Sequence, residues 1–315
     1  MNEKLDIITL GEALIEFSSD KSFKDTTCFE KYFGGDAIAT AICASRMGSK
    51  VGFITCVGND AFKDFLLDAW KAENLNIDCV KEVDDQNGVV LISRHDGYPK
   101  EIACYRKKTG STKISIDNIK EDYIKNTKYF YTTGIAQSLS ISANEAVKTC
   151  YKIAKENNVI TAYDPNYKPS ITSAEVAKEN FEDIISDVDI LFLSGKNDVA
   201  NLLETDSIEN VIKYCWDLGV QIIVVKSTKD FGYYTGYKGD IIFCRYSEEH
   251  IVDTTCSGDV FNGAFLNALT NGSTPFEATK FASVVSGLQA QNVGAIKSIP
   301  SRETVVKKLK EAEDK

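Results

Sequence analysis

The sequence contains only two histidines, His95 and His250, and they lie far apart in the chain. A histidine-based zinc site or a Ser/His catalytic triad therefore has little support. The nine cysteines form no CxxC pair, and the chain opens on polar and charged residues with no signal peptide. We therefore expect reduced thiols and a cytoplasmic protein.

Long apolar runs and net positive charge are also missing. No segment approaches the roughly 18 apolar residues that a membrane span requires. The net charge of −10 argues against nucleic acid as a partner. There is no repeat, low-complexity tract or proline-rich linker, and no Walker A motif. The 315 residues, 43% of them hydrophobic, are enough for one large core, so we expect one domain with an appendage.

The chain does contain an alternation of short strand-like runs with amphipathic stretches. Six runs are predicted strands: Leu5–Leu10, Val51–Cys56, Lys128–Thr133, Val159–Asp164, Asp189–Ser194 and Gln221–Lys226. Seven stretches have helical spacing: Ala37–Met47, Phe62–Ala72, Ala143–Glu156, Ile208–Leu218, Asp259–Thr270, Phe276–Gln291 and Arg302–Glu313. This order predicts an α/β fold with a mostly parallel central sheet covered by helices on both faces.

Two segments interrupt this alternation. Glu16–Phe33 is polar and irregular, and Val83–Tyr105 alternates apolar and polar residues. We expect them to pair as a small antiparallel sheet that stands off the main body. A hairpin over Phe231–Arg245, turning at Tyr237–Asp240, is predicted to close one edge of the main sheet.

The most informative segment runs from Asp253 to Phe265. Cys256, Ser257 and Gly258 precede a predicted helix, and Asp259 falls in its first turn. Free backbone N–H groups and the helix dipole make such a helix start an anion site. A carboxylate there cannot bind the anion, so its expected task is to take a proton from an attacking hydroxyl, as phosphoryl transfer to an alcohol requires. The alternative is an ordinary helix start, because Ser, Gly and Asp are all favourable there.

Other polar residues follow the ends of predicted strands. Glu12 and Glu16 come after the first strand, Gly34-Gly35-Asp36 precedes an alanine-rich helix, and Asp164–Lys168 follows another strand. Each motif alone is a common turn. Ligands of open parallel sheets bind beyond the carboxyl ends of the strands, so together these motifs indicate one site at that edge.

These motifs, in this order, resemble those of the ribokinase-like (PfkB-type) carbohydrate kinases over nearly the whole chain. The segment from Asp253 to Phe265 is similar to the family's C-terminal signature, with Asp259 at the position of the base. Gly34–Gly48 resembles the N-terminal signature, and Val57–Asp60 matches a third motif. Within the family, 2-keto-3-deoxygluconate kinases are the most similar, through Gly11–Glu16, Phe33–Asp36, Asp68–Trp70, Tyr105-Arg106 and Asp164–Lys168.

The resemblance implies a ribokinase-like three-layer sandwich, formed by a single domain 1–315 with lid segments at about 16–33 and 83–105. It also implies ATP-dependent transfer of the γ-phosphoryl group to a primary hydroxyl of a small sugar acid or ketose, 2-keto-3-deoxygluconate above all. Asp259 would be the general base and the backbone of Cys256, Ser257 and Gly258 the anion hole. Sugar contacts would come from Glu12, Gly34, Gly35, Asp36, Tyr105, Arg106, Asn166, Lys168 and Asp259.

The same resemblance implies nucleotide contacts from Ser194, Lys226, Thr228, Gly232, Gly258 and Asn292. Mg²⁺ would arrive with ATP, held partly through water. Asp253, Thr255 and Ser298 would frame a monovalent-cation site for K⁺. The lid would also form the interface of a homodimer.

Five residues depart from the family pattern: Ala39, Asn197, Thr228, Cys256 and Lys168. Ala39 is expected to enlarge the sugar pocket, Asn197 to weaken the hold on Mg²⁺, and Cys256 to cost stability if its φ is positive. Two other functions stay open: a fructokinase-, ribokinase- or nucleoside-kinase activity, and a catalytically weak sugar-binding pseudokinase. Arg106 has an alternative as part of a solvated charge run, and Cys256 as a redox-sensitive thiol.

Overall fold

The computed structural model describes residues 4–94, 101–203, 205, 207–246 and 250–313, so His95 lies outside the described residues. Nine strands form the main sheet in the order β13-β12-β11-β10-β9-β8-β1-β4-β5. All neighbours from β11 to β5 are parallel, and only the β11–β12 and β12–β13 pairs are antiparallel. The strands are β1 (Ile7–Leu10), β4 (Val51–Gly58), β5 (Asn76–Val83), β8 (Tyr129–Thr133), β9 (Ile160–Asp164), β10 (Ile190–Ser194), β11 (Ile222–Ser227), β12 (Gly232–Tyr237) and β13 (Asp240–Arg245).

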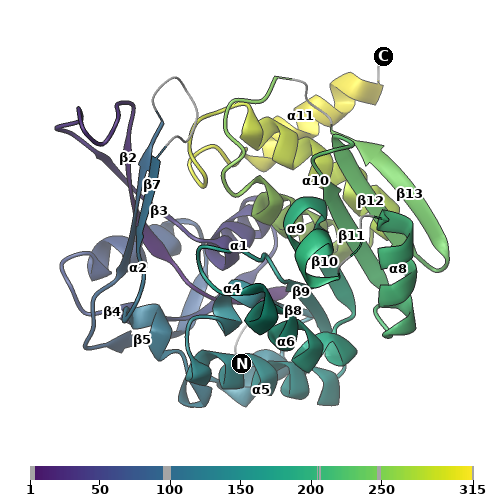
Figure 1. The fold of residues 1–315 in the computed structure, drawn as a ribbon, viewed down its shortest axis with the longest axis horizontal. Helices are drawn as coiled ribbons and strands as arrows, with labels where there is room; N and C mark the ends of the chain where they lie inside the picture. Colours follow the sequence, from purple (N-terminus) through teal and green to yellow (C-terminus); the bar gives the residue numbers. More distant parts are fainter. Residues whose placement is uncertain (1–3, 95–100, 204, 206, 247–249, 314–315) are drawn as a thin grey trace.

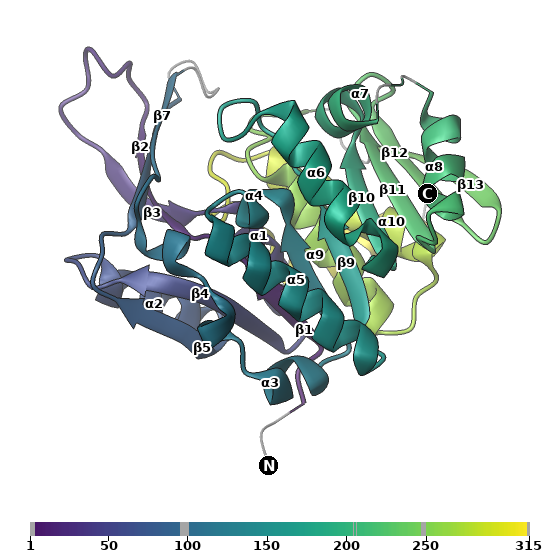
Figure 2. The same ribbon diagram turned by 60° about the horizontal axis from the view of Figure 1, so that its bottom comes forward.

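Helices cover both faces of this sheet, as Figures 1 and 2 show. One apolar core contains residues of α1 (Asp36–Arg46), α2 (Lys63–Ala72), α9 (Ser257–Thr270), α10 (Pro275–Ala290) and α11 (Arg302–Glu313). The other contains residues of α3 (Glu121–Lys125), α5 (Ile141–Glu156), α6 (Ala174–Ile184) and α8 (Ile208–Asp217). The short helices are α4 (Gly134–Gln137) and α7 (Ala200–Leu202). Helices cover each face of the sheet, so the central strands are buried on both faces and are apolar on both. This arrangement confirms the predicted three layers.

A separate four-stranded sheet, which we call the lid, stands at the upper left of Figure 1. Its order is β3-β2-β6-β7, formed by β2 (Leu14–Ser19), β3 (Glu30–Gly34), β6 (Gly88–Ser93) and β7 (Glu101–Tyr105). The expected antiparallel pairing holds for its two outer pairs and is wrong for β2–β6, which is parallel. β1 and β5 run in the same direction in the main sheet. β2 follows β1, and β6 follows β5, so the chain enters the lid in the same direction both times.

The six predicted strands and the hairpin are confirmed, with Lys238 and Gly239 at positive φ in the hairpin turn. The sequence analysis missed β5 and α6. β5 is an edge strand whose Asp78, Lys81 and Glu82 side chains are exposed, so its composition is unlike that of a buried strand. α6 buries only a narrow stripe that includes Ala177, Phe181 and Ile184. Within the described residues, no helix combines the length and the apolar character that crossing a membrane demands.

Candidate active site

Four carboxylates from distant parts of the chain come together at the carboxyl edge of the main sheet. Glu12 follows β1, Asp36 opens α1, Asp164 ends β9 and Asp259 lies in the first turn of α9. All four are buried. The carboxyl ends of parallel strands meet at one edge, and this edge is where open α/β sheets bind ligands. We call these residues the carboxylate cluster.

Asp259 has the electrostatic character of a base. Its side chain is buried, and the Asn166 side-chain amide donates a hydrogen bond of 3.2 Å to its Oδ1. Burial raises the pKa of Asp259 to about 7, with further increases from the negative charges of Asp36 and Asp164, against the lowering effect of Lys226 and Lys168. A carboxylate whose pKa lies near neutrality can accept a proton efficiently at that pH.

The start of α9 has the free backbone amides that an anion site requires. The Ser257 N–H donates to the Thr254 carbonyl at 3.1 Å. Among the described residues, no acceptor takes the N–H groups of Cys256, Gly258 or Asp259. These free amides and the positive end of the dipole of α9, a helix of 14 residues, create a positive potential next to the carboxylate cluster. Of the three amides predicted for the anion hole, that of Ser257 already has an acceptor in this conformation.

Cys256 is in the left-handed region, with φ 58° and ψ 13°. The positive φ under which Cys256 was expected to cost stability is therefore present. A non-glycine residue in the left-handed region costs about 1 kcal/mol. Burial and the charges of Asp259, Glu16 and Asp36 raise the pKa of its thiol well above the ordinary value. A thiol that stays protonated is a poor redox switch, so the structure argues against that alternative.

Replacing Cys256 by glycine is expected to raise the free energy of unfolding by up to about 1 kcal/mol, because glycine adopts positive φ without strain. Turnover should respond as well, because glycine removes a thiol that interacts with the Asp259 carboxylate. Urea unfolding monitored by fluorescence measures the first quantity. A variant less stable than the parent would show that packing of the sulfur outweighs the backbone strain.

Lys226, near the end of β11, is held beside the anion site. Its Nζ lies 2.5 Å from Asp164 Oδ2, and Asn262 of α9 donates to the same oxygen at 2.7 Å. A Cβ added to Gly258 would lie 3.4 Å from the Lys226 Nζ, so the cation is next to the free amides of α9. The sequence analysis missed Asn262, whose signal is a polar residue one turn after Asp259 inside a buried helix.

At the lid side of the cluster, Arg106 pairs with Glu12. Burial raises the pKa of Glu12 to about 7, although Arg106 opposes this shift. The Arg106 side chain is 18% exposed and its Nε has no partner, so the solvated charge run is wrong for this residue. Gly35 has φ 131°, and a Cβ there would lie 2.6 Å from the Glu12 carbonyl, so only glycine fits. Asp36 accepts a 2.5 Å hydrogen bond from the Thr133 hydroxyl.

Several residues predicted for the site lie apart from the cluster or have another contact. Tyr105 is 67% exposed, and Thr228, Lys168 and Asn292 are also exposed. Lys168 nevertheless lies close enough to lower the pKa of Asp259. Gly232 packs within the hairpin, because a Cβ there would lie 2.5 Å from the Cys244 carbonyl. Gly34 ends β3 with its Cβ position 3.2 Å from Glu16 Oε2.

Two of the departures from the family pattern have structural explanations. Ala39 is completely buried in the apolar core, so the enlarged pocket expected there is absent. Beside Asn197 the structure reveals Asp198, a buried carboxylate that the sequence analysis missed. Its oxygens accept the backbone N–H groups of Tyr167 at 2.8 Å and Ser194 at 2.6 Å. The Ser194 hydroxyl in turn accepts the N–H groups of Asn197 and Asp198 and so caps a short π-helix, Gly195–Val199.

The three residues expected to hold K⁺ already use their side-chain oxygens. Asp253 Oδ1 accepts from the Thr255 N–H at 2.8 Å and the Thr255 hydroxyl at 2.5 Å. Asp253 Oδ2 accepts from Arg94 Nε and the Gly294 N–H, both at 3.0 Å. Ser298 donates its hydroxyl to the Gly294 carbonyl. The residues present therefore do not fit a bound cation in this arrangement.

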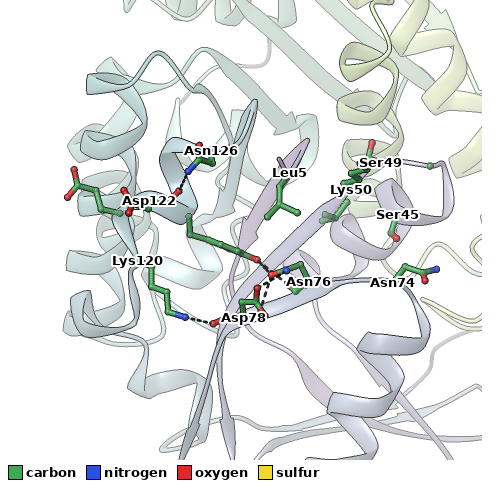
Figure 3. A pocket seen from close by; sticks show the side chains of 14 residues that line it. Leu5, Ser45, Ser49, Lys50, Asn74, Asn76, Asp78, Lys120, Asp122 and Asn126 are labelled. Atoms are coloured by element: carbon green, nitrogen blue, oxygen red, sulfur yellow. Dashed lines mark hydrogen bonds between the residues drawn. The ribbon is translucent and has the colours of Figure 1, made fainter. Parts of the chain in front are cut away.

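A cavity of about 980 Å³ lies at the opposite edge of the sheet. It is near the amino ends of β1, β4 and β5 and contains none of the carboxylate cluster (Figure 3). Its polar groups are paired with one another: Lys120 donates to the Asp78 carbonyl at 2.7 Å and Tyr123 to the Asn76 side chain at 2.6 Å.

Comparison with known proteins agrees with this geometry. Residues 4–302 match the model of the pfkB family carbohydrate kinases. The ATP-dependent 6-phosphofructokinase of Thermoanaerobacterium thermosaccharolyticum is 30% identical over 96% of this chain and 94% of its own. The 2-dehydro-3-deoxygluconokinase of Bacillus subtilis is 24% identical over 95% and 94%. A ribokinase II of E. coli, solved with ATP and Mg²⁺, superimposes with a TM-score of 0.89 at 21% identity, covering 98% of this chain and 99% of that one.

Proposed function

Because the chain belongs to the pfkB family of carbohydrate kinases, we propose that it transfers the γ-phosphoryl group of ATP to a primary hydroxyl of a small sugar acid, with Asp259 as the general base. The observation that carries the proposal is a buried carboxylate of pKa about 7 at the start of a helix whose amides are free. A base and an anion hole side by side are the minimum that phosphoryl transfer to an alcohol requires.

In this reaction Asp259 accepts the hydroxyl proton as the sugar oxygen attacks phosphorus. The N–H groups of Gly258 and Asp259 and the Lys226 ammonium stabilise the charge that develops on the transferred group. Asn166 holds Asp259 through its hydrogen bond to Oδ1. Asp164 and Asn262 keep Lys226 next to the anion hole, so the network of α9, β9 and β11 orients both the base and the cation.

ATP supplies Mg²⁺, which neutralises charge on its phosphates. The residues present fit a metal held mainly by the nucleotide and water. Asp164 already accepts from Lys226 and Asn262, and both oxygens of Asp198 accept backbone N–H groups. Residue 197, next to Asp198, is an asparagine and offers no carboxylate to Mg²⁺.

The cations near the cluster support a sugar acid as the substrate. Arg106 and Lys168 would face its carboxylate, and Glu12, Asp36, Gly34 and Gly35 would contact its hydroxyl groups. Three exposed apolar side chains of the lid region, Phe29, Ile102 and Tyr105, are available for the contact of a homodimer. Tyr105 would reach the sugar only after the lid closes.

An ADP-release assay with Mg-ATP tests the proposal on a panel of 2-keto-3-deoxygluconate, fructose, fructose 6-phosphate, ribose and a nucleoside. We expect the highest kcat/KM with the sugar acid. A higher value for fructose 6-phosphate would instead give this chain the reaction named for its phosphofructokinase relative. Lack of turnover on every compound would refute the proposed kinase activity toward these substrates.

Replacing Arg106 by leucine is expected to raise KM for the sugar acid by roughly 10- to 100-fold, because a charge-assisted contact is worth about 1.5–3 kcal/mol. KM for a neutral ketose should change little. The neighbouring exposed Lys107, replaced by leucine, is the matched control and should affect neither. Equal increases in KM for acid and ketose would show that Arg106 does not contact the carboxylate.

A further inference from the structure

A buried arginine connects the lid to the loop that forms the anion hole. Arg94 directly follows β6, and its side chain is only 3% exposed. Its Nε lies 3.0 Å from Asp253 Oδ2, and its Nη1 lies 3.0 Å from Glu16 Oε1 and contacts the Ser18 hydroxyl. Its backbone N–H donates to the Ser19 carbonyl at 2.7 Å. The guanidinium at the end of β6 thus binds two residues of strand β2 and the residue that begins the anion-hole loop.

Arg94 supplies one positive charge to this cluster and so offsets one of its two negative charges. Asp253 is 1% exposed and Glu16 is 3% exposed, so two carboxylates are buried there. Buried charges are costly unless they are paired and hydrogen-bonded. Although burial opposes it, hydrogen bonds from Thr255 and Gly294 and the charge of Arg94 lower the pKa of Asp253. The positive charge required beside Asp253 is therefore covalently attached to this chain.

A monovalent cation at Asp253 would have to share its site with this guanidinium. Oδ2 of Asp253 already accepts from Arg94 and Gly294, and Oδ1 from both donors of Thr255. Two like charges a few ångströms apart repel, most strongly where water is excluded. K⁺ and the Arg94 side chain thus exclude each other at this position.

We propose that Arg94 is the built-in cation of the anion-hole loop, a positioning residue that replaces K⁺ and makes the protein independent of monovalent cations. Asp253 lies three residues before Cys256, where the backbone turns into α9. Fixing Asp253 fixes the direction of the amides that follow. Because Glu16 and Ser18 belong to β2, the same side chain also couples the position of the lid to the anion hole.

The effect on turnover rests on the proposed kinase function, whereas the effect on thermal stability does not. For the parent protein, we compare buffers containing KCl with buffers containing tetramethylammonium chloride at equal ionic strength. Turnover and melting temperature should be the same in both, since an ion that does not bind does not stabilise. Activation by K⁺ of more than roughly tenfold would overturn the proposal.

The decisive variant is Arg94→Ala, which leaves Asp253 and Glu16 without their cation. We expect a lower melting temperature and a kcat reduced by roughly 10-fold or more, with a smaller change in KM for the sugar. Guanidinium chloride at a few millimolar, and K⁺, should restore part of both, because a free cation can now bind in the vacated space. A variant with parent kcat, or one whose melting temperature responds to neither ion, would contradict the proposal.

Arg245→Ala is the control, because Arg245 is exposed on β13. The same ions should leave its melting temperature unchanged, and equal stabilisation of both variants would show a general salt effect.

If Arg94→Ala does not fold, Arg94→Lys replaces it. Lysine keeps the positive charge, so the proposal predicts that K⁺ changes neither the melting temperature nor the turnover of this variant. Activation of the variant by K⁺ would overturn the proposal. The melting measurements decide the point even if the panel of sugars shows no turnover.

Discussion

Asp259→Asn should reduce kcat by about 100-fold or more while leaving sugar binding largely intact. A positioned general base contributes roughly 10²–10⁴-fold, and the amide keeps the shape of the carboxylate without its basicity. In the parent protein, kcat/KM should rise with pH through an apparent pKa near 7, because Asp259 must be deprotonated to act and burial raises its pKa to about 7. Steady-state kinetics between pH 5.5 and 9 and calorimetric titration of the sugar measure both effects.

The same substitution should increase stability at high pH. A pKa raised from 3.8 to about 7 means that the folded state favours the protonated group. The contribution of Asp259 to stability is therefore fully present below pH 4 and is lost as the pH rises through 7. At pH 8 the variant should gain about 1–3 kcal/mol in free energy of unfolding, and much less at pH 5. Parent-like turnover in Asp259→Asn would reject the base, and an equal gain in stability at both pH values would reject its raised pKa.

Lys226→Met should be strongly destabilising. The Lys226 and Asp164 side chains are 12% and 2% exposed, and removing one partner of a buried ion pair costs about 3–5 kcal/mol. The variant also loses a cation beside the free amides of α9, so kcat should fall by roughly 10²–10³-fold. Lys226 lowers the pKa of Asp259, so the remaining activity should require a higher pH than in the parent. Urea unfolding and the pH profile of kcat/KM measure these effects.

Lys168→Met is the matched control for stability and for the pH profile. Lys168 also lowers the pKa of Asp259, with a smaller effect than Lys226, and its side chain is exposed. Its loss should shift the profile less and leave the free energy of unfolding within about 0.5 kcal/mol of the parent. Equal destabilisation by the two substitutions would show that the Lys226–Asp164 pair does not stabilise the fold.

Much of the fold was predictable because its elements are locally encoded. Apolar runs of four to eight residues separated by helical spacing identify buried parallel strands, and six of them were confirmed. The edge strand β5 and the helix α6 were missed because each buries little apolar surface. The two lid segments were expected to pair, but the antiparallel direction was wrong for β2 and β6, because these strands are about 70 residues apart and no local pattern encodes their relative direction.

The sequence by itself determined the family, the three layers and the place of Asp259 at the start of a helix. These follow from periodicity and from motifs whose residues are adjacent in the chain. Only the tertiary structure decided which charges meet: Glu12 with Arg106, Asp164 with Lys226, and Arg94 with Asp253 and Glu16. The physical reason is that electrostatic energies and pKa values depend on distance and burial, and both are set by contacts between residues about 60 to 160 positions apart.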